Sequence, residues 1–161
     1  MSKVFIGIGS SINRQENIRL AIKTLKTVFG ELTISPVYES EAVGFEGTNF
    51  YNLVVCFEST LSAREVIKQL KTIEIQQGRP EKAIKFAPRT IDLDLLLHDQ
   101  MIDLEIDLPR AEILTNAFVL QPLSDIAPNL PHPIVNKTYQ ILWDNFPKSH
   151  QKLWQIDAII N

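Results

Sequence analysis

The apolar and polar positions at the start of the chain predict a buried strand followed by a helix. Residues 3–9, KVFIGIG, form a nearly continuous apolar run that ends in a glycine turn, which is typical of a core strand. Apolar residues then recur at helical spacing up to Gly30, where a helix C-cap glycine belongs. Asn13 and Glu16 stand three residues apart and predict a capping box at the start of this helix.

The next apolar runs predict two strands separated by a loop. Residues 32–40, LTISPVYES, are interrupted by Pro36, which cannot donate a backbone hydrogen bond, so we expect this strand near an edge or a bulge. Residues 41–48 have the composition of a loop. Residues 49–59, NFYNLVVCFES, predict a second and stronger strand.

A second helix and a further strand follow. Ser62 and Glu65 have capping-box spacing ahead of an apolar stripe that ends at Gly78. The polar stretch 79–88 is longer than most connections in compact domains, which favours a functional loop. In the strand after it, alternate residues point to one face, and the apolar ones are Ile91, Leu93, Leu95 and Leu97.

The predicted order of elements, β-α-β-β-α-β, is that of an α+β, ferredoxin-like fold with two helices on one face of an antiparallel sheet. Residues 100–109 predict a short hairpin partner for the preceding strand, and residues 113–128 predict a further helix. We expect Trp143 and Trp154 to pack the proline-rich C-terminal region onto the body. No repeat or linker divides the sequence, so residues 1–161 are expected to form one domain.

Composition narrows the class of protein. The 161 residues have a formal net charge of −3, which disfavours a nucleic-acid partner because such proteins usually have a basic excess. No apolar run is long enough to cross a membrane, and the N-terminus lacks the features of a signal peptide. Cys56, the single cysteine, lies in an apolar run and is expected to be buried. We expect a cytoplasmic monomer with no membrane partner.

Two acidic residues interrupt the apolar pattern of the strand near residue 91. Asp92 and Asp94 fall together on the face opposite the leucines, with Cα atoms roughly 6.5 to 7 Å apart. Carboxylates this close repel unless a positive charge lies between them, and Mg²⁺ favours one or two carboxylates plus substrate phosphates. Arg89 could reach the same phosphates. The alternative is a solvated acidic face. His98 is expected at the surface, facing away from the pair.

Other nucleotide-binding motifs are absent from the sequence. No glycine-bounded loop ends in Lys-Ser or Lys-Thr, and Ile12 occupies the third glycine position of a dinucleotide fingerprint. Near the end of the second helix, Glu74 is either a partly exposed helix terminus or an acceptor for a ligand. Arg79 is either a solvated cation or a phosphate contact.

These residues resemble the signature of a known family. The segments IEIQQGR, with Glu74 and Arg79, and KFAPRTIDLDLLL, with Arg89, Asp92 and Asp94, are similar to the 6-hydroxymethyl-7,8-dihydropterin pyrophosphokinase family. GIGSS, GFEGTNFYNLVV and AFVLQPLSDIAP also match in order, so the similarity covers nearly the whole chain. It implies the ferredoxin-like fold and the transfer of pyrophosphate from ATP to the pterin's hydroxymethyl group, with release of AMP, in folate biosynthesis.

The resemblance also implies catalytic and ATP-binding residues. Asp92 and Asp94 would hold two magnesium ions with ATP, and Arg79 and Arg89 would contact the nucleotide phosphates. Glu74 would lie beside the ATP. Phosphoryl transfer depends on positioning and charge neutralisation more than on a protein nucleophile, so the absence of a nucleophilic triad is expected.

A pterin pocket is implied by the same resemblance. Phe50 and Phe118 would stack on the pterin and Asn52 would hydrogen-bond its edge, while backbone groups of Ser40 and Val43 would complete the pocket. An aromatic sandwich suits a flat polar heterocycle, and an amide offers both a donor and an acceptor. The alternative for the two phenylalanines is a plain core position.

The sequence departs from the family pattern chiefly at donors to the ATP phosphates. Glu81 and Asn116 stand at arginine positions, Phe86 replaces a tryptophan, and Arg110-Ala111 replaces the usual histidine and its neighbour. Arg110 is expected to bind ATP in place of the histidine, because a guanidinium binds phosphate bidentately. Two alternatives stay open: a relative that acts on a related acceptor, and a pterin- or nucleotide-binding module with weak catalysis. An RNA-binding domain is disfavoured by the net acidity.

Overall fold

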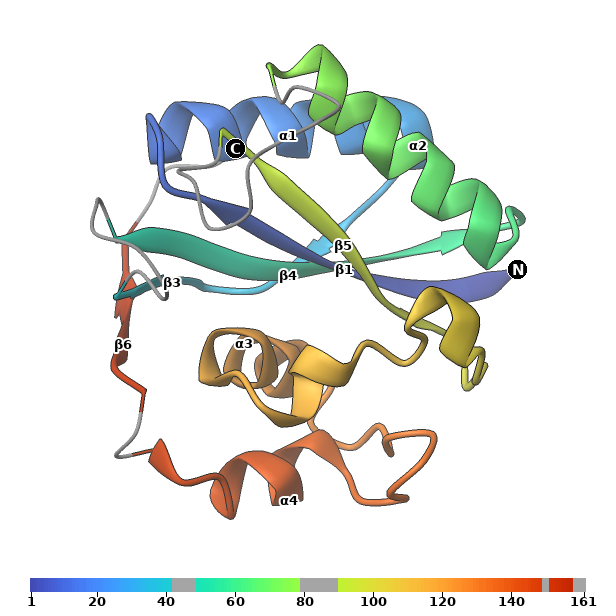
Figure 1. The fold of residues 1–161 in the computed structure, drawn as a ribbon, viewed down its shortest axis with the longest axis vertical. Coiled ribbons are helices and arrows are strands. Elements are labelled where there is room, and N and C mark those ends of the chain that lie inside the picture. Colours follow the sequence, from blue (N-terminus) through green and yellow to red (C-terminus); the bar gives the residue numbers. More distant parts are fainter. Residues whose placement is uncertain (42–48, 79–89, 149–150, 158–161) are drawn as a thin grey trace.

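The computed structural model describes residues 1–41, 49–78, 90–148 and 151–157. An antiparallel sheet lies between two layers of helices (Figure 1). Helices α1 (Arg14–Phe29) and α2 (Ala63–Gln76) cover one face, and the helices that follow β5 cover the other. The predicted α+β, ferredoxin-like order is confirmed, and the C-terminal helices add a third layer to it.

The sheet has the strand order β5-β1-β4-β3-β6, and β2 also pairs with β4. The strands span Ser2–Ser10 (β1), Thr33–Ile34 (β2), Val37–Ser40 (β3), Phe50–Ser59 (β4), Asp92–His98 (β5) and Leu153–Ile156 (β6). The predicted interruption at Pro36 is confirmed, because it separates β2 from β3. The sequence did not predict β6, which pairs with β3 through backbone hydrogen bonds. Trp154 lies in this strand opposite Glu39 and is 42% exposed, so the C-terminal segment joins the body mainly through backbone pairing.

The start of α1 differs from the prediction. Asn13 has a left-handed backbone, with φ 38°, and its side chain accepts no capping hydrogen bond. A side-chain N-cap normally requires an extended backbone at this position. Asn17 instead donates from Nδ2 to the Ile12 carbonyl oxygen at 2.6 Å. The helix and its end at Gly30 are confirmed, whereas the predicted capping box is wrong.

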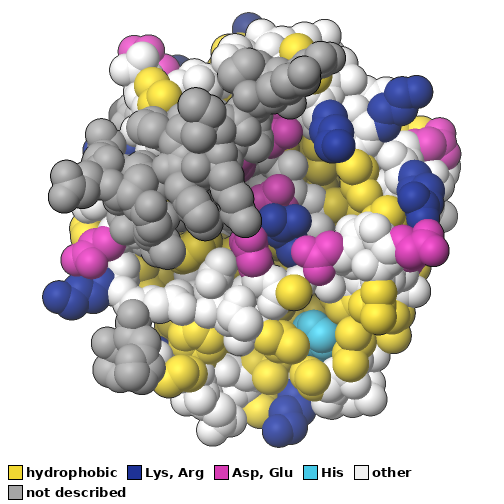
Figure 2. All heavy atoms as spheres, in the orientation of Figure 1, with side chains coloured by type: hydrophobic (Ala, Val, Ile, Leu, Met, Phe, Trp, Pro, Cys, Tyr) yellow, Lys and Arg dark blue, Asp and Glu magenta, His cyan; other side chains and the backbone are white. Residues whose placement is uncertain are grey.

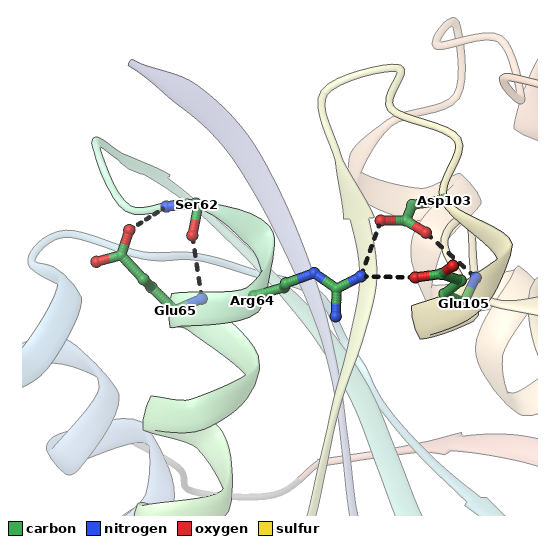
Figure 3. A network of polar contacts seen from close by, with 5 residues as sticks. All are labelled: Ser62, Arg64, Glu65, Asp103 and Glu105. Carbon is green, nitrogen blue, oxygen red and sulfur yellow. Dashed lines mark hydrogen bonds and ion pairs between the residues drawn. The ribbon is translucent and has the colours of Figure 1, made fainter.

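The start of α2 is as predicted. Ser62 Oγ accepts from the Glu65 N–H at 3.2 Å, and Glu65 Oε1 accepts from the Ser62 N–H at 3.2 Å (Figure 3). Arg64 points away from this capping box toward the segment after β5, where its Nη2 lies 3.2 Å from Glu105 Oε2 and 3.5 Å from Asp103 Oδ2. The Arg64 side chain is 61% exposed, so these ion pairs add little stability.

A bulge in β5 changes the face on which its last residues lie. The pairing of β1 with β5 skips Leu96 between Leu95 and Leu97, so Leu96 is the extra residue of a β-bulge. Leu95 packs under α1 and α2, whereas Leu97 packs in the core of the other face, and its predicted side is therefore wrong. The surface position predicted for His98 is also wrong. It is buried, with Nε2 2.9 Å from the Leu61 carbonyl oxygen.

The other face is covered by η2 (Ala111–Leu114), α3 (Ala117–Ile126) and α4 (Tyr139–Asp144), whereas η1 (Leu104–Ile106) packs Ile106 against the core under α1 and α2. The strand predicted over 100–109 is wrong: the turn η1 forms there because Asp103 Oδ1 accepts from the Glu105 N–H. The helix predicted over 113–128 is confirmed as α3, with a break before Ala117. Trp143 packs in this layer as predicted, 5.8 Å from the ring of Phe146.

Cys56 is buried as predicted. Burial raises the pKa of its thiol to about 11, so the thiolate is scarce at neutral pH. Within the described ranges, no helix combines the length and the apolar composition that a membrane span requires.

Candidate functional site

The acidic pair and Asn52 share the face of the sheet opposite α1 and α2. Asp94 pairs with Gly7 and Asp92 with Gly9, and Gly9 also pairs with Asn52 of β4. Residues paired directly across antiparallel strands point to the same face. Asp92 and Asp94 therefore share one face, as the alternation along the strand predicted, and Asn52 lies two strands away.

Glycines on β1 make room for these neighbours. A Cβ at Gly9 would lie 2.9 Å from Asn52 Oδ1, closer than real Cβ atoms approach other atoms, whereas a Cβ at Gly7 would lie 3.4 Å from a methyl group of Leu96. Glycine at position 9 therefore lets the Asn52 amide lie across β1. The GIGS segment is explained by this close approach and not by a dinucleotide-binding turn.

Two of the predicted pocket residues, Ser40 and Phe50, lie beside Asn52, and a third, Phe118, lies on the helix that covers this face. The Asn52 side chain is buried, and its Nδ2 donates to Ser40 Oγ at 3.0 Å. Phe50 pairs with Ser40 on the same face and is partly buried. Phe118, the second residue of α3, is partly buried against the core of this face.

Tyr38 ties α3 to the sheet beside this group. It pairs with Asn52 across β3 and β4, and its hydroxyl donates to the carboxylate of Asp125 in α3. Burial raises the pKa of Tyr38, and the hydrogen bond to Asp125 raises it further. Because α3 also contains Phe118, this bond helps to set the position of that ring relative to Asn52. Neither Tyr38 nor Asp125 was predicted, since they are 87 residues apart in the sequence.

Arg110 approaches the acidic pair from the segment before η2. Its Nη2 lies 3.6 Å from Asp94 Oδ2 and 3.0 Å from Glu112 Oε1. Its Nη1 lies 3.7 Å from Asp107 Oδ2. The Arg110 N–H donates to the Leu96 carbonyl oxygen at 3.0 Å, which holds this segment on β5. Figure 2 shows acidic and basic side chains gathered near the middle of this side of the molecule.

The ring of carboxylates around Arg110 was not predicted from the sequence. Glu112 is close to Arg110 in the sequence, but nothing in a pattern of apolar residues indicates that the two side chains meet. Asp107 is positioned by its own hydrogen bond, because its Oδ1 accepts from the Ala111 N–H at 3.0 Å. Burial lowers the pKa of Arg110, but the surrounding carboxylates raise it by more, so the guanidinium stays charged.

The electrostatics of Asp94 favour a cation. Burial raises the pKa of the Asp94 carboxyl to about 7, and Arg110 opposes this rise. The carboxylates of Asp92, Glu112 and Glu74 add to it. The Asp94 side chain is still 37% exposed, so an ion from solvent can reach it. A divalent cation would lower the cost of ionising this group.

The donors on this face fit magnesium. Mg²⁺ usually binds one or two carboxylates and completes its octahedron with waters and substrate phosphates. Among the described residues, no group of three or more His, Cys, Asp and Glu side chains is arranged to hold a metal ion. Asp92 and Asp94 thus suit a cation that shares its ligands with a substrate.

Glu74, near the end of α2, contacts the backbone of β5 between Asp92 and Asp94. It is buried, and its Oε2 accepts from the Leu93 N–H at 2.8 Å. The interpretation as a partly exposed helix terminus is therefore wrong, and its contact with a nucleotide stays a prediction. Five residues of the sequence prediction lie outside the described residues: Arg79, Arg89, Val43, Glu81 and Phe86.

Comparisons with known proteins agree on one family. Residues 5–128 match the family model described as 7,8-dihydro-6-hydroxymethylpterin-pyrophosphokinase (HPPK). The 2-amino-4-hydroxy-6-hydroxymethyldihydropteridine pyrophosphokinase of Aquifex aeolicus is 37% identical over 141 residues, which cover 85% of this chain and 88% of that protein. The protein of the same name from Porphyromonas gingivalis is 36% identical over 141 residues, which cover 83% and 95%.

A solved structure supports the fold. The chain is similar to the crystal structure of wild-type Plasmodium falciparum HPPK-DHPS with pteroate, with a TM-score of 0.69 and 13% sequence identity. The match covers 89% of this chain and 42% of that chain, so this chain corresponds to less than half of the Plasmodium protein.

Proposed function

The chain belongs to the 7,8-dihydro-6-hydroxymethylpterin-pyrophosphokinase family, and on this premise we propose that it transfers a pyrophosphoryl group from ATP to 6-hydroxymethyl-7,8-dihydropterin and releases AMP. The observation that carries this proposal is the arrangement of one sheet face. A carboxylate pair on β5, a buried amide on β4 and an arginine against Asp94 lie there together.

Asp92 and Asp94 are the proposed ligands of magnesium, with two ions accompanying ATP. When bound, magnesium neutralises the phosphate charge and fixes the phosphate orientation. The raised pKa of Asp94 supports this role, because the folded protein itself supplies too little positive charge for the ionised carboxylate. Held on one rigid strand, the two carboxylates keep a constant spacing, which such positioning requires.

Arg110 is the proposed phosphate ligand on the C-terminal side. Its guanidinium is charged and lies beside Asp94, so it can donate to phosphate oxygens held near that carboxylate. Arg79 and Arg89 are proposed as further phosphate ligands and Glu74 as a neighbour of the ATP, on the sequence resemblance alone. Together these arginines would balance the charge of the triphosphate during transfer.

The pterin is proposed to bind over β3 and β4. Asn52 would read its polar edge, with its amide already fixed by the bond to Ser40 Oγ. Phe50 and Phe118 would stack on its two faces, and the backbone groups of Ser40 and Val43 would complete the pocket. A substrate held there has its hydroxymethyl group on the same sheet face as the acidic pair. The positioned hydroxyl needs no strong protein base in this chemistry.

A product assay tests the function directly. The protein is incubated with ATP, Mg²⁺ and 6-hydroxymethyl-7,8-dihydropterin, and the nucleotide products are separated by chromatography. We expect AMP to form in step with the pterin pyrophosphate, and no AMP when EDTA replaces Mg²⁺. Formation of ADP would reject pyrophosphoryl transfer in favour of ordinary kinase action.

The same assay discriminates the remaining alternatives. Tight pterin binding without AMP would support a binding module. AMP formation that is much faster with another hydroxymethylated heterocycle would support a related acceptor, an alternative motivated by Asn116 at a position where the family usually has arginine.

We also propose that residues 1–161 form one domain and that the protein is a monomeric cytoplasmic enzyme. These proposals are independent of the product assay. The packing of both helical layers on one sheet supports the first.

A further inference from the structure

Arg110 occupies a junction between Asp94 and two other carboxylates. One nitrogen, Nη2, is shared: it lies 3.0 Å from Glu112 Oε1 and 3.6 Å from Asp94 Oδ2. Nη1 faces Asp107 at 3.7 Å. The contact with Asp94 is therefore the longer of the two that Nη2 makes, and it can be lost while Glu112 keeps the guanidinium in place.

The third nitrogen of Arg110, Nε, indicates that the present contacts of the guanidinium change when a ligand binds. Nε is buried and has no hydrogen-bond partner among the described residues. A buried donor without a partner is costly, and a phosphate oxygen is the acceptor that best matches a guanidinium edge. In the protein without ligands, the guanidinium thus has three carboxylate neighbours and a buried Nε–H without an acceptor among the described residues.

We propose that Arg110 is an internal counter-ion of the acidic pair, which competes with divalent cations for Asp94 until nucleotide phosphates take Arg110 over. This inference rests on the proposed metal role of Asp92 and Asp94. It adds that Arg110 weakens metal binding without nucleotide and strengthens nucleotide binding once metal is present. One side chain would then have opposite effects on the two ligands.

Arg110 and a divalent cation compete for Asp94 because their positive charges would lie a short distance apart. A magnesium ion lies about 2.0 to 2.1 Å from a ligating carboxylate oxygen. With Nη2 at 3.6 Å from Asp94 Oδ2, a bound ion and the guanidinium would be close neighbours of like charge, in a partly buried site where salt screens poorly. Phosphate oxygens remove this conflict, because they add negative charge that both cations can share.

A metal-binding measurement without nucleotide tests the proposal. The probe is Mn²⁺, and its binding to the full chain is measured by calorimetry and by the loss of the free-ion EPR signal. Arg110→Gln removes the charge and is compared with Arg110→Lys, which keeps it. Arg64→Gln is the matched control, because Arg64 also pairs with carboxylates, those of Asp103 and Glu105 (Figure 3), and neither belongs to the site.

The expected result is a gain of Mn²⁺ affinity in one variant. Arg110→Gln should bind Mn²⁺ roughly ten- to a hundredfold more tightly than the wild type, which is the effect of removing one charge-assisted contact. Arg110→Lys and Arg64→Gln should stay within about twofold of the wild type. An unchanged or weaker affinity in Arg110→Gln overturns the proposal, and so does an equal gain in Arg64→Gln.

A second titration with the non-hydrolysable analogue AMPCPP separates this inference from the proposed function. With Mn²⁺ present, Arg110→Gln should bind AMPCPP more weakly than the wild type by a similar factor. If Asp94→Asn binds Mn²⁺ and AMPCPP as the wild type does, the metal site itself fails and both proposals fall. If Asp94→Asn loses metal and Arg110→Gln shows no gain, only the counter-ion role is rejected.

An NMR measurement covers the case in which Arg110→Gln does not fold. The side-chain Nε–H signal of Arg110 in the wild type is assigned by its absence in Arg110→Lys. Adding Mg²⁺ alone should shift this signal along the same binding curve as the metal titration, because the guanidinium moves from Asp94 toward Glu112. A signal that does not respond to saturating Mg²⁺ overturns the proposal.

Discussion

The two faces of the sheet differ in how uniform they are. The face under α1 and α2 has a continuous apolar core that includes residues from β1, β4 and β5. The opposite face is apolar only where α3 and α4 cover it (Figure 1), and it becomes polar around Asp92, Asp94 and Asn52. The first face is therefore occupied mainly by a core, whereas the second is shared between a core and a site.

The apolar core of the first face and the site on the second face meet in strand β5. Leu95 lies in the apolar core of the first face, and its neighbour Asp94 lies in the site on the second. Strand geometry makes this possible, because successive side chains point to opposite faces. Substitutions of adjacent residues should thus separate function from stability.

The largest expected effect is on activity, from Asp94→Asn. This change keeps the shape of the side chain and removes the charge that a cation needs, so kcat/KM should fall about a hundred- to a thousandfold. The unfolding free energy in urea, measured in EDTA, should not fall, because burial already disfavours the ionised carboxylate. Near-normal turnover in this variant would show that Asp94 has no role in catalysis.

The next effect is on stability, from Leu95→Ala on the other face. Leu95 is 6% exposed in the core under α1 and α2, and its truncation should lower the unfolding free energy by about 2 to 5 kcal/mol. The folded fraction should retain most of its activity per molecule at low temperature. If Leu95→Ala loses activity as strongly as Asp94→Asn, the division between the two faces is wrong.

A smaller effect is expected inside the site, from Gly9→Ala. The new Cβ would meet Asn52 Oδ1 at 2.9 Å, so the amide must shift, and KM for the pterin should rise about tenfold, as for the loss of one hydrogen bond. KM for ATP should change little. Gly7→Ala is the matched control, because its Cβ would make an ordinary contact of 3.4 Å with Leu96. An equal rise in both variants would contradict this role of Gly9.

The smallest effect is a pH dependence in the layer that covers the site face. His132 Nδ1 accepts from the N–H groups of Ile134 and Val135 at 3.1 and 3.3 Å, and burial lowers the pKa of His132. The unfolded chain therefore takes up the proton first as the pH falls. The contribution of His132 to stability is fully present above about pH 6.5 and decreases below it, by about 1 kcal/mol or less.

His132→Asn tests this pH dependence. Asparagine keeps an acceptor and has no proton to gain, so the variant should show a flatter change in unfolding free energy between pH 7.5 and 5.5. Urea titrations at both values measure the difference. Equal slopes for the wild type and the variant would assign the acid sensitivity to other groups.

Local patterns predicted the elements of the first face well. The spacing of apolar residues predicted α1, α2 and the strands between them, and the capping box at Ser62 and Glu65 is present. The predictions failed where a single residue changed the local geometry. Asn13 has a left-handed backbone, and Leu96 bulges out of β5, which carries Leu97 to the other face.

The site was predicted in part, because its residues come from separate elements. Strand alternation was enough to put Asp92 and Asp94 on one face, and the resemblance to a family indicated Asn52, Phe50 and Phe118. The partners of Arg110 and the bond from Tyr38 to Asp125 depend on contacts between distant segments, which no local pattern encodes.

The sequence by itself determined the period of each element, the sharing of one face by the two aspartates, and the family. Those features follow from spacing along one segment or from residues matched in order. Only the tertiary structure decided which cation lies against Asp94, where Glu74 and His98 point, and that β6 closes the sheet beside β3. The reason is physical: the energy of a charge or a buried hydrogen bond depends on distances in space, which are set only when the layers have packed.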